Sequence, residues 1–121
     1  MPSPITVLVV EDEPLVRMDI SEQMRDLGFI VLEAADADAA IILLMSNSDI
    51  QVVFTDVDMP GSMDGLKLAA AVRDRWPPVK IIVTSGHRKV QPADIPQESR
   101  FFRKPYVARD IAAAAVEMVN A

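Results

Sequence analysis

The feature of this sequence that most constrains its fold is a regular alternation of short apolar runs with longer helical patterns. The run from Ile5 to Val10 is almost continuously apolar and rich in β-branched residues, which is typical of a strand buried on both faces. Similar runs cover residues 29–34, 50–55 and 79–84, and a shorter one covers 100–103. Five strands separated by helices predict an α/β fold, a doubly wound parallel sheet with helices on both faces.

The segments between these runs carry helix signals. Pro14 suits a first helical turn, Gly28 a C-terminal stop, and Asp36 an N-terminal cap of the second helix. A third helix is predicted over 65–76, ending before Pro77. The apolar stripes predicted for the four helices are Val16, Ile20, Met24 and Leu27; Ala37, Ile41 and Leu44; Leu68, Ala69 and Val72; and Val107, Ile111, Ala115 and Met118.

The segment 87–99 does not follow the pattern. A fourth helix would be expected before the last strand, but Pro92 and Pro96 interrupt it. We therefore predict a shortened or irregular fourth helix, reduced to one short turn or a loop.

Size and charge limit the classes of function. The 121 residues suit one domain, 1–121, with no attached effector, and half of them are apolar. The net charge of −6, with scattered Lys and Arg, argues against direct binding to nucleic acid. The sequence contains no cysteine, no export signal and no apolar run near the ~18 residues of a membrane span, so we expect a cytoplasmic protein.

Polar residues gather where the predicted strands end. They are Glu11, Asp12 and Glu13 after the first strand, Asp56 and Asp58 after the third, Ser85 after the fourth and Lys104 after the fifth. Ligands of open α/β sheets bind at these carboxyl ends. If the first and third strands are neighbours, three carboxylates (Glu11, Asp12 and Asp56) converge, and their repulsion calls for a shared proton or cation. Mg²⁺ is the oxygen-preferring ion that such a set predicts.

A carboxylate beside Mg²⁺ can act as a nucleophile toward a phosphoryl group. Phosphoryl transfer requires positioning and neutralisation of the phosphoryl oxygens, which Mg²⁺, the Lys104 ammonium and a hydroxyl such as that of Ser85 can supply. Alone, each residue has an ordinary structural role, such as a helix cap or a turn. Their joint placement at four strand ends predicts phosphoryl-transfer chemistry.

The same residues carry a family resemblance. The segments Val7–Pro14, Phe54–Pro60 with Met63–Leu66, and Lys104-Pro105 resemble, in order and spacing, the receiver domains of bacterial two-component response regulators. The resemblance covers nearly the whole chain. It implies the flavodoxin-like strand order 2-1-3-4-5, which receiver domains share.

The resemblance also implies roles at the metal site. Asp56 would be the phosphoacceptor, in a Mg²⁺-dependent reaction with a histidine kinase or a phosphotransfer protein as donor. Asp12 and Asp56 would bind Mg²⁺ directly together with the backbone carbonyl of Asp58, and Glu11 would act through water.

Further roles concern the conformational switch and an unknown downstream partner. Ser85 matches the switch hydroxyl, with Thr84 as the alternative, and Phe101 matches the aromatic residue that reports phosphorylation. Lys104 would contact the phosphoryl group, and its peptide bond to Pro105 is expected to be cis. His87 stands where a side chain influences loss of the phosphoryl group, although an exposed loop histidine explains it equally well.

Two departures from the family pattern affect these expectations. The loop at 60–63 is one residue longer than usual, and only 15 residues separate Ser85 from Phe101. The partner-binding face should therefore differ in shape. The chain is either a stand-alone regulator or part of a larger protein, such as a hybrid sensor kinase.

Three other functions are compatible with parts of the sequence. Asp56-Val-Asp58 is similar to the nucleophile motif of haloacid-dehalogenase phosphatases, which place it on the first strand of a longer chain. A Ser/His/Asp hydrolase would use Ser85 and His87, but the Gly-X-Ser-X-Gly motif is absent. An interaction module without phosphorylation remains open, and the complete acidic set with Lys104 argues against it.

Overall fold

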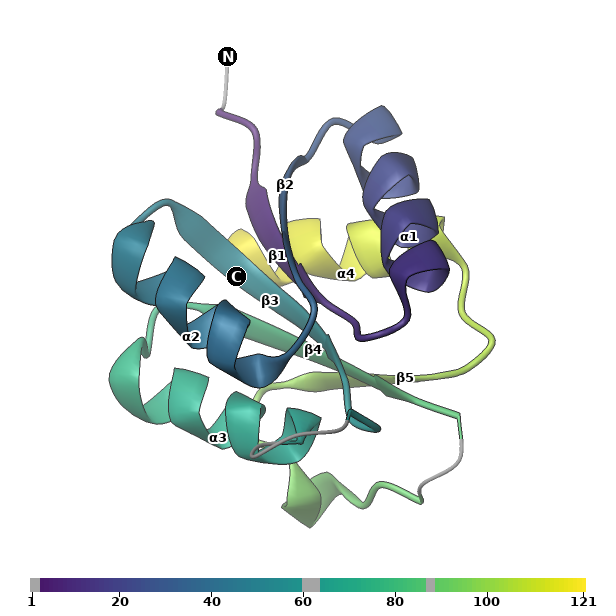
Figure 1. Cartoon of the computed structure of the whole chain (residues 1–121). Helices are drawn as coiled ribbons and strands as arrows, with labels where there is room; N and C mark the ends of the chain where they lie inside the picture. The colour runs from purple at the N-terminus through teal and green to yellow at the C-terminus, as the bar shows by residue number, and fades with distance from the viewer. Residues whose placement is uncertain (1–2, 60–63, 87–88) are drawn as a thin grey trace.

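The computed structural model describes residues 3–59, 64–86 and 89–121, and over these ranges it contains a five-stranded parallel sheet with the order β2-β1-β3-β4-β5 (Figure 1). The strands are β1 (Thr6–Val10), β2 (Ile30–Ala34), β3 (Ile50–Asp56), β4 (Lys80–Ser85) and β5 (Arg100–Arg103). The helices are α1 (Pro14–Asp26), α2 (Ala37–Ser46), α3 (Gly65–Arg75) and α4 (Ala108–Val119). The predicted fold class and strand order are confirmed, and each predicted strand agrees within one residue at either end.

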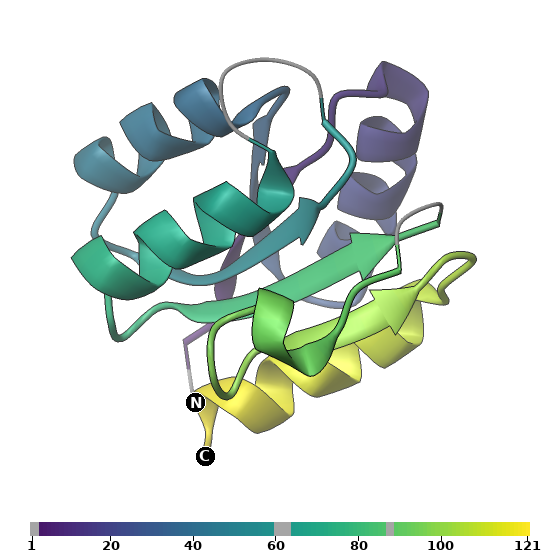
Figure 2. The same cartoon turned by 90° about the horizontal axis from the view of Figure 1, so that it is seen from below.

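Two helical layers enclose the sheet. Helices α1 and α4 cover one face and α2 and α3 the other, as Figure 2 shows from below. Each face of the sheet carries its own hydrophobic core, and alternate residues of β1 point into one or the other. Val7 and Val9 pack toward α1 and α4, and Leu8 and Val10 pack toward α2 and α3. All four of these side chains are at most 1% exposed, which explains the unbroken apolar run of this strand.

The predicted helix signals are present in the structure. Pro14 is the first residue of α1, and Gly28 follows that helix with a φ of 97°, a left-handed conformation that favours glycine. Asp36 caps α2 by accepting a hydrogen bond from the Ala39 N–H at 2.8 Å. Asp64 caps α3 in the same way, accepting from the Lys67 N–H at 3.0 Å. These short-range signals decide where the helices begin and end.

The predicted apolar stripes are wrong at three of their ends, because Val16, Leu27 and Val107 are exposed. Leu27 and Val107 are cap residues outside the regular helices, so the helical period no longer directs their side chains toward the core. Val16 lies in the first turn of α1 and lines an open hollow instead of packing on the sheet. The central positions of the stripes, such as Ile20 and Met24, are buried as predicted.

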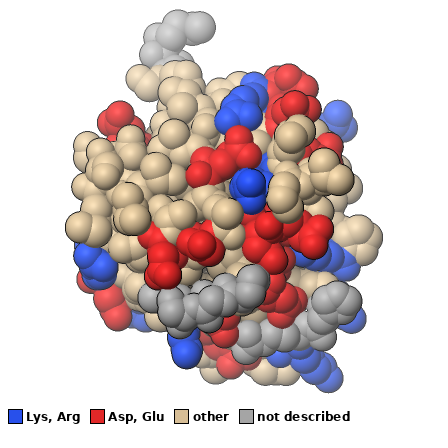
Figure 3. All heavy atoms as spheres, viewed as in Figure 1, with Lys and Arg blue, Asp and Glu red and all other residues tan. Residues whose placement is uncertain are grey.

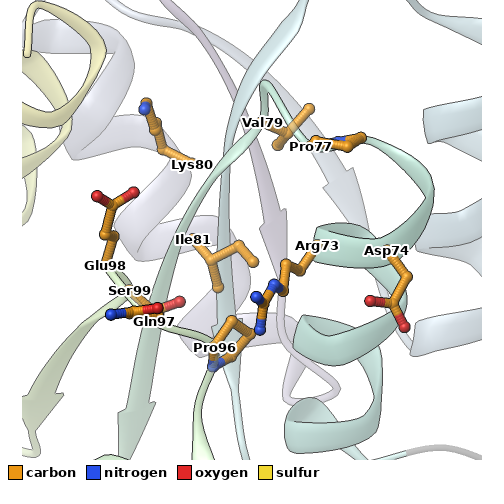
Figure 4. Close-up of a pocket in the computed structure, with 10 residues that line it drawn as sticks. All are labelled: Arg73, Asp74, Pro77, Val79, Lys80, Ile81, Pro96, Gln97, Glu98 and Ser99. Atoms are coloured by element: carbon orange, nitrogen blue, oxygen red, sulfur yellow. The ribbon is translucent and has the colours of Figure 1, made fainter.

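The sequence predicts that the helix between the fourth and fifth strands is shortened or irregular, and the described residues of that segment confirm this. Between β4 and β5, residues 89–99 form one 3₁₀ turn, η1 (Pro92–Asp94), and otherwise lack regular structure. Ile95 packs partly against the core beneath α3, and Pro96 is buried. A hollow of about 540 Å³ remains between this segment and α3, lined by Arg73, Lys80 and Glu98 among others (Figure 4). Because Lys80 begins β4, the hollow lies at the opposite end of this strand from the polar residues at the carboxyl ends.

Among the described residues, no helix combines the length and the apolar character needed to cross a lipid bilayer.

Candidate functional site

Three carboxylates meet at the carboxyl end of the sheet. Strands β1 and β3 are neighbours with Val10 opposite Thr55, so the next residues, Glu11 and Asp56, lie side by side. One carboxylate oxygen from each of Glu11, Asp12 and Asp56 lies within 4.8 Å of the others. Glu11 and Asp56 are only 4% and 5% exposed. The predicted convergence of these three side chains is confirmed.

Burial and the neighbouring carboxylates raise the pKa of Glu11. Burial raises the pKa of Glu11 to about 8, and a hydrogen bond and the negative charge of Asp56 add to the effect. The positive charge of Lys104 acts in the opposite direction. At neutral pH the protonated form of Glu11 is therefore favoured, because burial and the nearby Asp56 both disfavour a charged carboxylate there.

Lys104 supplies the positive charge of the site. Its Nζ donates to Asp56 Oδ2 at 2.9 Å, and its side chain is about one-third exposed while Asp56 is buried. Burial alone would lower the pKa of Lys104, but the hydrogen bond and the charges of Asp56, Glu11 and Asp58 raise it above its usual value. Because its pKa is raised, the lysine keeps its positive charge where it contacts Asp56. The Lys104–Pro105 peptide bond is cis, as predicted.

Asp58 and Ser85 extend the site from the other side. The Asp58 N–H donates to Asp56 Oδ1 at 3.1 Å, and the Ser85 hydroxyl donates to Asp58 Oδ2 at 3.0 Å. Both oxygens of Asp56 thus accept a hydrogen bond, one from Lys104 and one from the Asp58 backbone. The Asp58 carboxylate lies outside the three-carboxylate cluster and contacts Ser85 instead.

The two candidate switch hydroxyls lie in different surroundings. Strand alternation places Ser85 on the face of Val83, toward α3, and Thr84 on the face of Ile82, toward α1 and α4. Thr84 Oγ1 is buried and, among the described residues, has no hydrogen-bond partner. Only Ser85 of this pair contacts the acidic residues that the structure describes.

Phe101 lies on β5 opposite Val83, on the same face of the sheet as Ser85. Its ring is half-buried and packs partly against the core beneath α3. The structure places Phe101 and Ser85 on adjacent strands of one face. His87 lies outside the described residues, as do Pro60 and Met63 of the quoted motifs.

Tyr106 is a residue near the site that the sequence reasoning missed. Its ring packs edge-on against Phe54 of β3, with centroids 5.3 Å apart. Burial raises the pKa of Tyr106 to about 12, and the charges of Glu11, Asp56 and Asp19 contribute. Tyr106 also lines a hollow of about 650 Å³ with Lys104 and Val16. Its position directly after Lys104-Pro105 was the signal that could have revealed it.

Gly65 belongs to a quoted motif, but its structural role emerges only in three dimensions. A Cβ at this position would collide with the backbone carbonyl of Asp56 and would lie 2.7 Å from Val57 Cα. The Gly65 N–H donates to the Val57 carbonyl at 3.1 Å. Helix α3 therefore begins in direct contact with the backbone that carries Asp56.

The donor set suits Mg²⁺. Glu11, Asp12 and Asp56 offer hard oxygen ligands within 4.8 Å of one another, the kind of donor that Mg²⁺ prefers. On the face shown in Figure 3, acidic side chains spread across the middle and basic side chains stand apart from one another. This distribution of charge favours a cation at the site.

Comparison with known proteins identifies the family. The sequence model of the response regulator receiver domain matches residues 7–115. The chain therefore belongs to the response regulator receiver family of two-component signalling. The phosphatase and hydrolase alternatives find no support in this assignment.

Solved structures agree with the family assignment. The structure is similar to a response regulator receiver protein from Sinorhizobium medicae WSM419, with a TM-score of 0.89, 28% identity, and 98% of this chain and 96% of that chain covered. It is also similar to the receiver domain from the hybrid histidine kinase CckA, with a TM-score of 0.77, 30% identity, and 94% and 98% covered.

Curated relatives are much longer proteins. The chain is 33% identical over 119 residues to the sensor kinase CckA of Brucella abortus (strain 2308), which covers 95% of this chain but 12% of that protein. It is 30% identical over 88 residues to the nitrogen assimilation regulatory protein NtrX of Azorhizobium caulinodans, covering 72% of this chain and 19% of that protein. The chain thus spans less than a fifth of the length of these relatives.

Proposed function

We propose that this receiver accepts a phosphoryl group on Asp56 in a Mg²⁺-dependent reaction and changes conformation as a result. The observation that carries the proposal is the environment of Asp56: one oxygen bonded to the Lys104 ammonium at 2.9 Å, beside two further carboxylates within 4.8 Å. A purely structural acid would not need a buried site with two acidic neighbours. A phosphoacceptor that works with a divalent cation does.

The chemistry is a displacement at phosphorus. An Asp56 carboxylate oxygen forms a bond to phosphorus, the bond from phosphorus to the donor's imidazole nitrogen breaks, and its electron pair stays on that nitrogen. Asp12, Asp56 and the backbone carbonyl of Asp58 would hold Mg²⁺ directly, and Glu11 would act through water. When bound, the ion neutralises charge on the phosphoryl oxygens. Lys104, already bonded to Asp56, supplies a second positive charge for the same oxygens.

The switch would use contacts that the new group changes. Phosphorylation places acceptor oxygens beside Asp56, and the Ser85 hydroxyl, now bonded to Asp58 at 3.0 Å, can donate to them instead. Movement of Ser85 would leave space on its face of the sheet, where Phe101 lies on the adjacent strand. We infer that Ser85, Lys104 and Phe101 carry the conformational change, and that Thr84 does not.

The partners follow from the proposed chemistry. A histidine kinase or a phosphotransfer protein would supply the phosphoryl group, and an unidentified downstream protein would recognise the changed surface. The irregular segment 89–99 gives that surface an unusual shape. We propose that the domain works in the cytoplasm as one receiver unit, either alone or within a larger protein.

Phosphorylation by a small donor tests the proposal. The protein is incubated with acetyl phosphate and Mg²⁺, and intact mass spectrometry should show one added phosphoryl group. Asp56→Asn should abolish it, whereas the matched control Asp58→Asn, which keeps the nucleophile, should retain it. EDTA or Asp12→Ala should suppress it strongly. Undiminished labelling of Asp56→Asn would refute Asp56 as the acceptor, and absence of labelling in the wild type would favour an interaction module that works without phosphorylation.

A second experiment separates phosphorylation from switching. Lys104→Ala should still accept a phosphoryl group, although more slowly, and should fail to change conformation. Amide chemical shifts of Ser85 and Phe101 before and after phosphorylation provide the readout. A complete shift in the variant would show that Lys104 does not transmit the signal.

A further inference from the structure

Arg17 of α1 makes a contact that the proposed chemistry does not explain. Its Nη1 donates to the backbone carbonyl of Glu11 at 2.7 Å. The carbonyl of Glu11 and the N–H of Asp12 belong to one planar peptide unit. A guanidinium bond to this carbonyl therefore restrains the peptide that joins two of the three clustered carboxylates.

The other side of Glu11 is held as well. The Glu11 N–H donates to the Ala34 carbonyl of β2 at 3.1 Å. Arg17 thus completes the fixation of the Glu11 main chain, with one bond from β2 and one from α1. The N-cap residue of α1, Glu13, forms no side-chain capping bond, so the adjoining loop does not receive its anchor there.

Arg17 is itself anchored. Its Nε lies 3.6 Å from Glu33 Oε1 on β2, and its side chain is 21% exposed. Glu33 also pairs with Arg25, two turns further along α1, at 3.1 Å. Glu33 therefore keeps the guanidinium of Arg17 close to the β1–α1 loop.

We propose that Arg17 is a positioning residue of the acidic site: by holding the Glu11–Asp12 peptide, it presets these two carboxylates for Mg²⁺. The inference rests on the proposed function, because it assumes that the cluster binds this ion. A restrained peptide lowers the entropic cost of bringing mutually repelling carboxylates onto one cation. The restraint acts on metal affinity and not on the transfer step.

The chain supplies a matched control in Arg25. Arg25 also lies on α1, also pairs with Glu33, and also donates to a backbone carbonyl, that of Val31, at 3.3 Å. The two arginines differ in the carbonyl that accepts their hydrogen bond, which belongs to Glu11 for Arg17 and to Val31 for Arg25. Comparing Arg17→Gln with Arg25→Gln therefore isolates the contact to Glu11.

Positioning and simple electrostatics predict opposite signs. Removing a positive charge near an acidic cluster should strengthen cation binding through the Coulomb interaction alone. If Arg17 positions the loop, Arg17→Gln should weaken Mg²⁺ binding in spite of the lost charge. The sign of the change therefore decides between the two effects.

The test is Mg²⁺ binding by isothermal titration calorimetry, with the wild type, Arg17→Gln, Arg25→Gln and Arg17→Lys. We expect Arg17→Gln to bind at least fivefold more weakly, Arg25→Gln to remain within twofold of the wild type, and Arg17→Lys to recover part of the affinity. With acetyl phosphate, Arg17→Gln should need more Mg²⁺ for half-maximal phosphorylation but reach a rate close to the wild type at saturating Mg²⁺. Equal or tighter binding by Arg17→Gln, or equal losses in Arg17→Gln and Arg25→Gln, would overturn the proposal.

The outcomes separate this inference from the proposed function. If the wild type binds no Mg²⁺ and is not labelled on Asp56, both fail. If the wild type is labelled and Arg17→Gln behaves like Arg25→Gln, only the role of Arg17 fails. Should Arg17→Gln not fold, Arg17→Lys against Arg25→Lys provides the same comparison with charge retained, and equal affinities of these two variants would contradict the proposal.

Discussion

The loops that follow β1 and β3 and the segment that joins β4 to β5 are built in different ways. Around Asp56, contacts come from distant parts of the chain: the Lys104 ammonium, the carboxylates that follow β1, and the start of α3 at Gly65. In the segment 89–99, hydrogen bonds among the described residues include local ones, such as those between Gln91 and Asp94 and from the Ser99 N–H to the Pro96 carbonyl.

This difference separates the site proposed for phosphoryl transfer from the surface proposed for a downstream partner. Transfer of a phosphoryl group requires several groups at fixed distances, and Asp56, the proposed acceptor, is restrained from two directions by Lys104 and the Asp58 N–H. The proposed partner surface does not need reacting groups at such fixed distances, so an irregular segment can replace a helix there without moving Asp56. The predictions that follow test how far the two regions differ, beginning with the largest effect.

The largest expected effect is a loss of stability on substitution of Gly65, where α3 contacts the backbone of Asp56 and Val57. Gly65→Ala places a Cβ against the Asp56 carbonyl and 2.7 Å from Val57 Cα, and neither backbone atom can yield easily. We expect a loss of about 3 kcal/mol or more in the free energy of unfolding. The control is Gly86→Ala, whose Cβ would meet only the flexible Lys104 side chain at 3.4 Å. Chemical denaturation of both variants measures the difference, and equal stabilities would show that the approach of α3 to Asp56 is not tight.

The next comparison concerns apolar packing. Leu68 of α3 is fully buried, whereas Ile95 in the irregular segment is half-buried. Leu68→Ala should cost about 2–5 kcal/mol and Ile95→Ala about 1 kcal/mol, because a half-buried side chain leaves a smaller cavity. Urea denaturation of the two variants gives the values. A larger loss for Ile95→Ala would mean that the segment 89–99 is as firmly packed as the helices.

The pH dependence of Tyr106 reports on the acidic region directly. As the only tyrosine, it can be followed by ultraviolet absorbance, and burial together with the charges of Glu11 and Asp56 raises its pKa to about 12. Its pKa in the unfolded chain is about 10, so its contribution to stability is complete below that pH and is lost as the pH rises through 12. Glu11→Gln removes one of the charges and should lower the pKa of Tyr106, whereas Glu22→Gln, an exposed change on α1, should not. Identical titrations of the two variants would separate Tyr106 from the acidic cluster.

The smallest expected effect is a change in the fluorescence of Trp76, the only tryptophan, on addition of Mg²⁺ or a phosphoryl donor. Trp76 caps the C-terminus of α3, one helix length of about 16 Å from the end that touches Asp56, and Arg75 lies 4.6 Å from its ring centroid. Its fluorescence should therefore change little when Mg²⁺ or acetyl phosphate is added. Strong quenching by Mg²⁺ would show that the acidic site is coupled to the far end of α3.

The sequence by itself determined the architecture and the membership of the acidic cluster. Continuous apolar runs and helical periods report burial, and proline, glycine and aspartate mark the ends of elements through local backbone preferences. The same locality explains why the strand limits of β1 to β5 could be read to within one residue. Glu11, Asp12 and Asp56 could be grouped because the carboxyl ends of parallel strands share one edge of the sheet.

Tertiary structure alone decided which groups touch. The choice of Ser85 over Thr84 for contact with Asp58 depends on which face of β4 each side chain occupies, and no sequence period marks that at a strand end. The bond from Arg17 to the Glu11 carbonyl and the collision that requires Gly65 both involve backbone atoms. Every residue carries the same backbone atoms, so the sequence holds no mark of which carbonyl will accept a bond or exclude a side chain. Only the packing of α1 and α3 on the sheet brings those atoms within reach.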